Sequence, residues 1–218
     1  MIITIDGPAG SGKSSAARNL AARLQFHFLD TGAMYRLVAL TTMNAKLDLG
    51  NAPAVAEIAK PLQLSLDQSH LQLNNVPLGP EIRTPEVALA ASKVAAHAEV
   101  RELLVHWQRQ LAEGHDIVSE GRDQGTVVFP KAEFKFFLTA DPAVRAERRQ
   151  QDLKSAGREV SQSQVLKEQQ QRDEQDSKRQ VAPLRAAEDA ICIDTSSMNL
   201  EEVVDQMEQL ILKQHKTS

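Results

Sequence analysis

The segment at residues 7–14 reads GPAGSGKS, in which three glycines precede a lysine and a serine. The glycines permit backbone angles that other residues resist, so consecutive N–H groups can converge on phosphate oxygens. We expect Lys13 to reach the β and γ phosphates of a nucleotide and the Ser14 hydroxyl to ligate Mg²⁺. A helical pattern follows the segment, which places the partly positive end of a helix beneath the anion. The expected phosphate contacts are Gly7, Pro8, Ala9, Gly10, Ser11, Gly12, Lys13, Ser14 and Ser15.

Charged side chains also gather after two expected strands and along one expected helix. Residues 30–36 read DTGAMYR and residues 121–126 read GRDQGT, each directly after an apolar run. In a doubly wound sheet the carboxyl ends of the strands open on one ligand crevice, so both strings should face it. Arg172, Asp176 and Arg179 are spaced by four and three residues, which puts them on one face of a helix. Their common direction indicates a shared ligand.

The elements that must position these residues alternate between strands and helices. Such alternation is typical of an α/β fold, with a parallel sheet covered by helices on both faces. Thr84, Asp141 and Ser161 are expected to open helices, Ser161 with Gln164 in a capping box, and Gly114 is expected to end one. The five expected core strands are Ile2–Asp6, Phe26–Leu29, Ile117–Ser119, Phe134–Leu138 and Ala190–Ile193.

Two segments depart from this alternation. Between residues 61 and 79, leucines alternate with polar residues and a Val-Pro-Leu-Gly string follows, which predicts a small antiparallel meander. Residues 150–159 are polar and charged, contain a glycine, and lie between two expected helices. We interpret them as a short lid over the donor phosphates. The alternative is an ordinary connection between helices.

The general properties of the chain fit one compact enzyme domain. The chain has 218 residues and a net charge of −4, from 25 basic and 29 acidic residues. This balance argues against a general nucleic-acid or membrane surface as partner. Cys192 is the only cysteine, so no internal disulfide or cysteine metal cluster can form. With no signal peptide, no apolar run near the ~18 residues that span a bilayer and no large apolar stripe left over, we expect a cytoplasmic monomer.

Taken together, these strings resemble the bacterial cytidylate kinases, nucleoside monophosphate kinases that move the γ-phosphoryl group of ATP onto CMP or dCMP. The resemblance covers the whole chain. It implies a P-loop kinase fold over residues 1–218, with a five-stranded parallel core, a monophosphate-binding insertion at about 48–82 and a lid at about 148–160. Besides the loop, the matching strings are LDTGAMYR at 29–36, EIRTPEV at 81–87, GRDQGTVVFP at 121–130, RDEQDSKR at 172–179 followed by VAPL, and AICIDTS at 190–196.

The same resemblance implies roles for residues around the acceptor nucleotide. Three arginines would hold the CMP phosphate, a task that suits planar guanidinium groups. These arginines are Arg36, Arg122 and Arg179, with Thr31 and Tyr35 nearby. The residues implied at cytosine are Ser92, Arg101 and Asp123, and those implied at the pentose hydroxyls are Arg172 and Asp176.

On the donor side, Arg148 and Arg149 match lid positions expected over the ATP phosphates. A solvated surface charge is the alternative for Arg149, as it is for Arg145. The accepting group is itself a phosphate oxyanion, which needs no base at neutral pH because its second pKa is near ~6. The enzyme's task is then to position two polyanions and neutralise their shifting charge. The residues expected to act in catalysis are Lys13, Arg122, Arg179 and Arg148.

Three positions depart from the family pattern or lack a role. Glu120 stands where an aspartate is usual, and we expect it to contact Mg²⁺ through water. Ala98 replaces a common proline, yet Ser92 and Arg101 lie nine residues apart and would face opposite sides of an unbroken helix, at about 100° per residue. We therefore predict a helix break near residues 96–99. Arg83 matches a family position, but no role for it follows from the sequence.

Two other classes of function remain open at this level. A phosphotransferase acting on UMP, AMP or a hydroxyl acceptor would use the same loop, and a hydroxyl acceptor would require a base such as Asp123 or Asp30. A nucleotide-dependent switch or motor would transfer the phosphoryl group to water. The guanine-reading string NKxD is absent from the sequence, which disfavours a GTPase.

Overall fold

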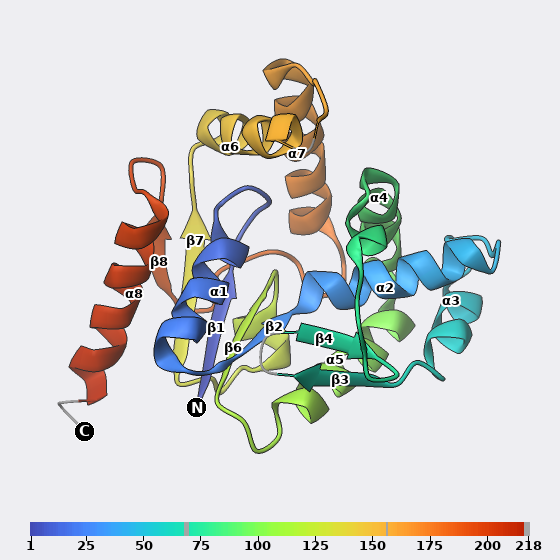
Figure 1. Ribbon diagram of the computed structural model, residues 1–218, viewed down its shortest axis with the longest axis horizontal. Helices are drawn as coiled ribbons and strands as arrows, with labels where there is room; N and C mark the ends of the chain where they lie inside the picture. Colours follow the sequence, from blue (N-terminus) through green and yellow to red (C-terminus); the bar gives the residue numbers. More distant parts are fainter. Residues whose placement is uncertain (68–69, 156, 216–218) are drawn as a thin grey trace.

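A computed structural model describes residues 1–67, 70–155 and 157–215 as a parallel sheet flanked by helices, with a small antiparallel sheet to one side (Figure 1). The strands are β1 (Ile2–Asp6), β2 (His27–Asp30), β3 (Leu64–Asp67), β4 (His70–Leu73), β5 (Val76–Pro77), β6 (Ile117–Gly121), β7 (Phe134–Thr139) and β8 (Ile191–Asp194). The helices are α1 (Lys13–Leu24), α2 (Thr31–Asn44), α3 (Ala52–Ala59), α4 (Pro85–Val94), α5 (Ala98–Ala112), α6 (Pro142–Ser155), α7 (Gln162–Lys178) and α8 (Leu200–His215), with a 3₁₀ turn η1 (Pro80–Arg83) and a π turn η2 (Gln124–Val128).

The main sheet has the strand order β2-β6-β1-β7-β8, and every neighbouring pair is parallel. The predicted five-stranded parallel core is therefore confirmed, with strand ends shifted by one or two residues. β1 lies at the centre, with β6 and β7 as its neighbours. Its carboxyl end leads into the glycine-rich loop, so the loop emerges from the middle of the sheet.

Two hydrophobic clusters cover the two faces of this sheet. On one face Ile3, Phe28 and Val118 point to the same side through matched register and pack against α1 and α8. Leu29 and Ile117 point to the opposite side and belong to the cluster formed with α2, α4 and α5. Because apolar clusters cover both faces, the strands appear in the sequence as short apolar runs, and this is how they could be located.

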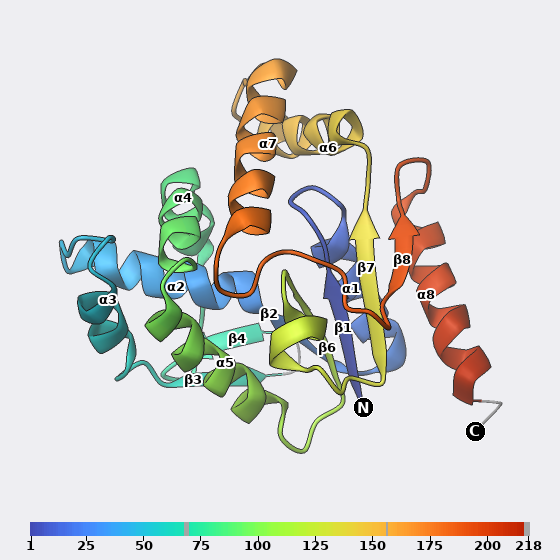
Figure 2. The same ribbon diagram turned by 180° about the vertical axis from the view of Figure 1, so that it is seen from behind.

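The segment between α2 and α4 is an insertion that packs beside the sheet (Figures 1 and 2). It contains α3, the antiparallel strands β3, β4 and β5, and η1. The predicted meander is confirmed, apart from residues 68–69, which lie outside the described residues. Leu71 and Ile82 are buried in the cluster that α2 and α4 also fill, so the insertion is anchored by apolar contacts.

The predicted interruption of the long helix is confirmed. α4 ends at Val94 and α5 begins at Ala98, so the break falls at residues 95–97, at the start of the expected stretch. His97 has an extended backbone there, and its ring nitrogen Nε2 lies 2.7 Å from the Leu49 carbonyl oxygen. A proline at position 98 would favour this turn. The turn forms here with Ala98, and the His97 side chain is anchored on Leu49.

The non-helical segment between α6 and α7 is shorter than the lid predicted at residues 150–159. α6 continues to Ser155, so residues 150–155 are helical, and Ala156 lies outside the described residues. Asp141 accepts a hydrogen bond from the Ala143 amide and caps α6 as predicted. Only half of the predicted capping box forms on α7: Ser161 Oγ accepts from the Gln164 amide, but the Gln164 side chain donates to Glu168. In the part of the chain described here, no helix has the length and apolar character needed to cross a bilayer.

Candidate active site

The glycine-rich loop has the backbone that phosphate binding requires. Gly7, Gly10 and Gly12 have φ angles of 152°, 78° and 83°, in the region that favours glycine. A Cβ atom on Gly7 would lie 2.1 Å from the Leu138 carbonyl oxygen, so this close approach also excludes a side chain. α1 begins at Lys13, which directs its N-terminus at the loop. The expected glycine conformations and the helix that follows the loop are confirmed.

Lys13 and two arginines form a compact cationic group beside the loop. The Lys13 ammonium is buried and donates to the Pro8 carbonyl oxygen at 3.1 Å. Burial lowers the pKa of Lys13 to about 7, and repulsion from Arg122 and Arg172 adds to this effect. Burial also lowers the pKa of Arg172 to about 10, again with repulsion from Arg122. Cations packed so closely are only partly balanced by the neighbouring carboxylates, and an anion would complete the site.

Glu120 and Ser14 lie on the same side of the loop. The Glu120 carboxylate is buried, burial raises its pKa, and the charge of Lys13 and a hydrogen bond from Ser14 oppose that rise. Its Oε2 atom has no hydrogen-bond partner. Among the described residues no three His, Cys, Asp or Glu side chains are grouped to hold a metal ion by themselves. A hydroxyl and one unpartnered carboxylate oxygen beside a phosphate loop nevertheless fit Mg²⁺, which takes few protein ligands and completes its shell with water and phosphate.

The arginines predicted to bind the acceptor phosphate are each paired with a carboxylate. Arg122 Nε donates to Asp176 at 2.9 Å, and Arg179 lies 3.8 Å from Asp176 and 4.0 Å from Asp123. Arg101 forms a buried ion pair with Asp123. Burial would raise the pKa of Asp176, but the charges of Arg122 and Arg172 hold it below its usual value. The structure therefore brings together most of the residues that the sequence assigned to the acceptor.

The position of Arg179 differs from the expectation in one respect. Helix spacing predicted Arg172, Asp176 and Arg179 on one helical face, but α7 ends at Lys178 and Arg179 has an extended backbone. Its side chain returns to Asp176 because the chain turns back after the helix, where Arg179 Nε donates to the Ala182 carbonyl oxygen. Arg179 therefore lies near Asp176 because of this turn, and not because of helical spacing.

Tyr35, Arg101 and Ser92 lie around the helix break. The Arg101 guanidinium is 5.6 Å from the centre of the Tyr35 ring and donates to the Ala95 carbonyl oxygen in the break. Burial raises the pKa of Tyr35 to about 12, so its hydroxyl stays protonated. Ser92 Oγ donates to the carbonyl oxygen of Ala88 on its own helix at 3.3 Å. The role of Ser92 at cytosine stays a prediction.

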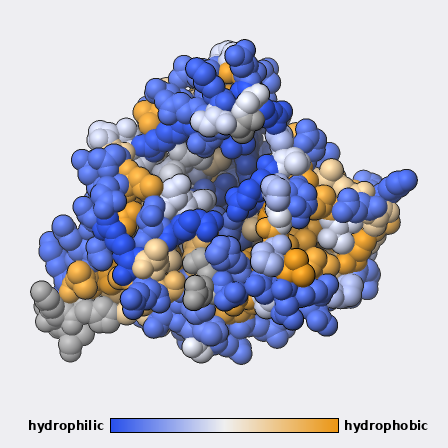
Figure 3. Space-filling view, in the orientation of Figure 1, coloured by the Kyte–Doolittle hydropathy of each residue, from blue (hydrophilic) through white to orange (hydrophobic). Residues whose placement is uncertain are grey.

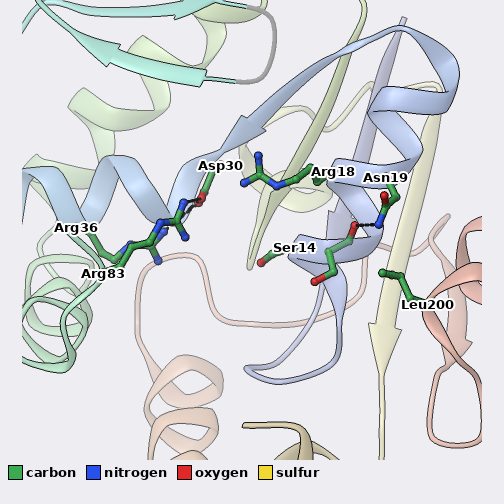
Figure 4. A pocket seen from close by; sticks show the side chains of 8 residues that line it. Ser14, Arg18, Asn19, Asp30, Arg36, Arg83 and Leu200 are labelled. Atoms are coloured by element: carbon green, nitrogen blue, oxygen red, sulfur yellow. Dashed lines mark hydrogen bonds and ion pairs between the residues drawn. The ribbon is translucent and has the colours of Figure 1, made fainter. Parts of the chain in front are cut away.

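A cavity of about 380 Å³ lies between the first turns of α1 and the side chains of Asp30, Arg36 and Arg83 (Figure 4). Asp30 stands at the carboxyl end of β2, and Arg36 lies 3.3 Å from both of its carboxylate oxygens. Arg83 approaches the same carboxylate at 3.6 Å from η1. The lining residues are Ser14, Ser15, Arg18, Asn19, Asp30, Arg36, Arg83 and Leu200. Figure 3 shows a hollow on this side of the molecule that is bordered by hydrophilic residues.

Thr31 and the lid arginines have partners within the protein. Thr31 Oγ1 donates to the Glu120 carbonyl oxygen at 2.7 Å and so ties the start of α2 to β6. Arg148 donates to the Thr195 hydroxyl and carbonyl oxygens and to the Met198 carbonyl oxygen. Arg149 is exposed, and its charge contributes to the lowered pKa of Arg172. Arg145, for which a surface charge was one alternative, is buried and bonded to the phosphate loop.

Sequence reasoning missed Asp6, which ends β1. Its buried carboxylate accepts from the amides of Gln124 and Gly125 at 2.9 and 2.8 Å, and burial raises its pKa to about 6. These bonds hold the π turn η2, directly after Arg122 and Asp123. An acid at the end of the strand before the loop was the available signal, but the turn that it would hold lies more than a hundred residues away.

Comparison with known proteins identifies relatives over nearly the full length. The family model described as "Cytidylate kinase" matches residues 3–213. A protein named cytidylate kinase from Caldanaerobacter subterraneus subsp. tengcongensis is 45% identical over 98% of this chain and 96% of its own length. One of the same name from Rhodopirellula baltica is 46% identical over 97% of this chain and 92% of its own length.

Solved structures support the fold at a greater distance. The shikimate kinase from Bacteroides thetaiotaomicron has a TM-score of 0.51 and 14% identity, covering 97% of this chain and 98% of that one. An uncharacterized protein from Eubacterium ventriosum has a TM-score of 0.54 and 13% identity at the same coverage. These likenesses concern the fold alone.

Proposed function

The chain belongs to the cytidylate kinase family, and we propose that it transfers the γ-phosphoryl group of ATP to CMP or dCMP in line, through the cationic cleft between the loop and the acceptor arginines. The products are ADP and CDP or dCDP. The observation that carries this mechanism is the group formed by Lys13, Arg122 and Arg172 beside the loop. Burial and repulsion from Arg122 lower the pKa of Lys13 and of Arg172, whereas Asp176 keeps the pKa of Arg122 above its usual value against the effect of burial. Two phosphate groups supply the negative charge that this arrangement lacks.

On the donor side, the loop amides and Lys13 bind the β and γ phosphates of ATP. The helix α1 begins at Lys13, so its N-terminal amides add to the positive potential. Ser14 and Glu120 are the residues that would hold Mg²⁺, which supplies positive charge to the donor phosphates when bound. Arg148 and Arg149 are assigned to the lid over these phosphates, and Arg148 must exchange part of its bonding to Thr195 for that role.

On the acceptor side, Arg36, Arg122 and Arg179 bind the CMP phosphate. In the structure these arginines lie on Asp30, Asp176 and Asp123, which hold them near the cleft. Arg101, Asp123 and Ser92 are assigned to cytosine, whose amine donates while its O2 and N3 accept. Arg172 and Asp176 are assigned to the pentose hydroxyls.

The chemical step moves one phosphoryl group between two oxygen atoms. An oxygen of the CMP phosphate forms a bond to the γ phosphorus while the bond from that phosphorus to the bridging oxygen of ADP breaks. The attacking oxygen is already ionised near neutral pH, since the second phosphate pKa is near ~6, so no side chain removes a proton. Lys13 and the arginines compensate the charge that shifts toward ADP during transfer.

We propose that two segments, residues 61–79 and 148–159, shift to close over the substrates when both ligands bind. Closure excludes water, which would otherwise compete as acceptor. Solution scattering with and without a bisubstrate analogue should show a smaller radius of gyration in the complex. Superimposable curves would contradict closure. We also propose a cytoplasmic monomer, which size-exclusion chromatography with light scattering tests for the oligomeric state.

A panel of acceptors tests the proposed function. With ATP as donor, CMP and dCMP should have the highest kcat/KM among CMP, dCMP, UMP, AMP and small hydroxyl acceptors. A better acceptor elsewhere in the panel would overturn the assignment. ATP hydrolysis that CMP leaves unchanged would favour a nucleotide-dependent switch or motor.

A further inference from the structure

Arg145 connects the phosphate loop to the helix that carries the acceptor residues. Its guanidinium is buried in α6, where Nε donates to the Ala140 carbonyl oxygen and Nη1 donates to the Ala9 carbonyl oxygen, both at 3.0 Å. The same guanidinium forms an ion pair with Asp173 on α7. One side chain therefore bonds to the end of β7, the loop and α7 at once.

The bond to Ala9 orients a donor of the phosphate loop. In a trans peptide the carbonyl of one residue and the amide of the next point in opposite directions. When Arg145 holds the Ala9 carbonyl on the outer side of the loop, the Gly10 amide is turned toward the inner side, where phosphate oxygens bind. Arg145 has no need to touch the nucleotide for this effect.

The bond to Asp173 transmits the position of α7. Asp173 follows Arg172 and precedes Asp176 by three residues, and both of these are assigned to the acceptor nucleotide. Gln169, one turn earlier, is buried and donates to the Arg145 carbonyl oxygen at 3.2 Å. A Cβ atom on Gly10 would lie 2.7 Å from the Gln169 amide nitrogen and 3.1 Å from Arg145 Cβ. The acceptor helix therefore packs directly on the loop, and a side chain at position 10 would collide with Gln169 and Arg145. Figure 1 shows the C-terminal part of the α7 ribbon near the end of β1 and the start of α1.

We propose that Arg145 and Asp173 are positioning residues that set the orientation of the Gly10 amide according to the position of the acceptor helix. The inference rests on the proposed phosphoryl transfer and adds a physical link between the donor and acceptor halves of the site. Movement of α7 toward a bound acceptor shifts Asp173, and with it the guanidinium that holds the loop. Alignment of the donor phosphates then depends on the acceptor being in place.

Kinetics of Asp173→Asn and Arg145→Lys test this link. Asp173→Asn removes the ion pair and keeps a side chain of the same size. Arg145→Lys keeps the charge but loses the planar fork that reaches several acceptors. We expect kcat to fall roughly 10-fold in the first variant and roughly 10- to 100-fold in the second, while KM for CMP changes less than about 3-fold, since misplaced donor phosphates slow transfer without weakening acceptor binding. Glu174→Gln is the matched control, because Glu174 is exposed and forms an ion pair with Lys178 one turn along the same helix.

The double variant distinguishes a shared path from separate effects. If Arg145 and Asp173 act as one unit, kcat of the double variant should lie within about 3-fold of the slower single variant. A decrease equal to the product of the two single effects would overturn the proposal. Wild-type kcat in Asp173→Asn, or a lowered melting temperature of both variants with unchanged kcat, would also overturn it.

Binding of a fluorescent, non-hydrolysable ATP analogue without acceptor separates this inference from the proposed function. Arg145→Lys should bind the analogue several-fold more weakly than the wild type and the Glu174→Gln control. This result would support the loop-positioning role even if the acceptor panel named a substrate other than CMP. Equal affinity in all three proteins would overturn the role of Arg145 and leave the proposed function untouched.

Discussion

The proposed donor and acceptor sides of the cleft are built from different parts of the polypeptide. On the donor side a contiguous loop presents backbone amides, and its outer carbonyls are held by neighbouring donors: Arg145 on Ala9 and Thr195 on Ser11. On the acceptor side the binding groups are side chains from separate elements, and each acceptor arginine lies on a carboxylate, as Arg122 does on Asp176.

This difference determines how the positive charge of each side is stabilised when no ligand is bound. Backbone amides are partial charges that need no counterion, so the loop remains stable without a ligand. Buried guanidinium groups are full charges, and leaving one unpaired costs several kcal/mol, on the order of 3–5. The acceptor side therefore keeps its own carboxylates, which an incoming phosphate must replace or share. The donor side should respond sharply to loss of its one lysine, whereas the acceptor side should lose activity in smaller steps.

Lys13→Ala should have the largest effect. Removing the ammonium that compensates charge in the transition state should lower kcat at least ~100-fold, while the affinity for CMP alone changes little. Steady-state kinetics and calorimetric CMP binding check this expectation. The control is Lys60→Ala, which removes an exposed lysine directly after α3 that pairs with Glu57. A near-normal kcat of the Lys13→Ala enzyme would contradict the expectation that the donor side depends on this one lysine.

Arg179→Ala should have the next largest effect, roughly 30-fold in kcat/KM, shared between a higher KM for CMP and a lower kcat. Asp123 and Asp176 remain near the site and then repel the acceptor phosphate. Lys178→Ala is the neighbouring control, since Lys178 is exposed and bonded to Glu174. Unchanged kinetics would place Arg179 outside the acceptor site.

The lowered pKa of Lys13 predicts a pH dependence of nucleotide binding. In the free protein Lys13 loses its proton as the pH rises through about 7. A bound polyphosphate favours the charged ammonium, so binding above this pH takes up a proton, and Kd for ADP should rise by up to ~10-fold per pH unit. Calorimetry at pH 8.5 in two buffers of different ionisation enthalpy measures the uptake. Equal heats in both buffers would contradict it, and Lys13→Gln should show none of this uptake.

Arg83→Gln should have the smallest effect. Arg83 is exposed, and its contact with Asp30 is long at 3.6 Å and shared with Arg36, so this ion pair should contribute little. We expect KM for CMP to rise about 3-fold with kcat unchanged, because the variant removes positive charge from the wall of the cavity that Arg36 also lines. An effect as large as that of Arg36→Gln would show that Arg83 binds the acceptor phosphate directly.

Much of the fold followed from the sequence because its signals are local. The loop needs only closely spaced glycines, a lysine and a serine, and the strands of a sheet buried on both faces appear as short apolar runs. The break between α4 and α5 followed from requiring Ser92 and Arg101 on one ligand, even without the usual proline. The extent of α6 was misjudged because a polar, charged sequence is compatible with both a lid and an exposed helix.

By itself, the sequence determined which side chains could bind phosphate and at which strand ends they would stand. Only the tertiary structure decided which of them are paired, and with what. It buried Arg145 between the loop and α7, turned Arg179 back after its helix, and set Asp6 against the amides of η2. Each of these contacts joins segments whose approach depends on how helices pack or how the chain turns. Residue spacing predicts which side chains share one face of a helix or strand. It does not predict which other element will pack against that face.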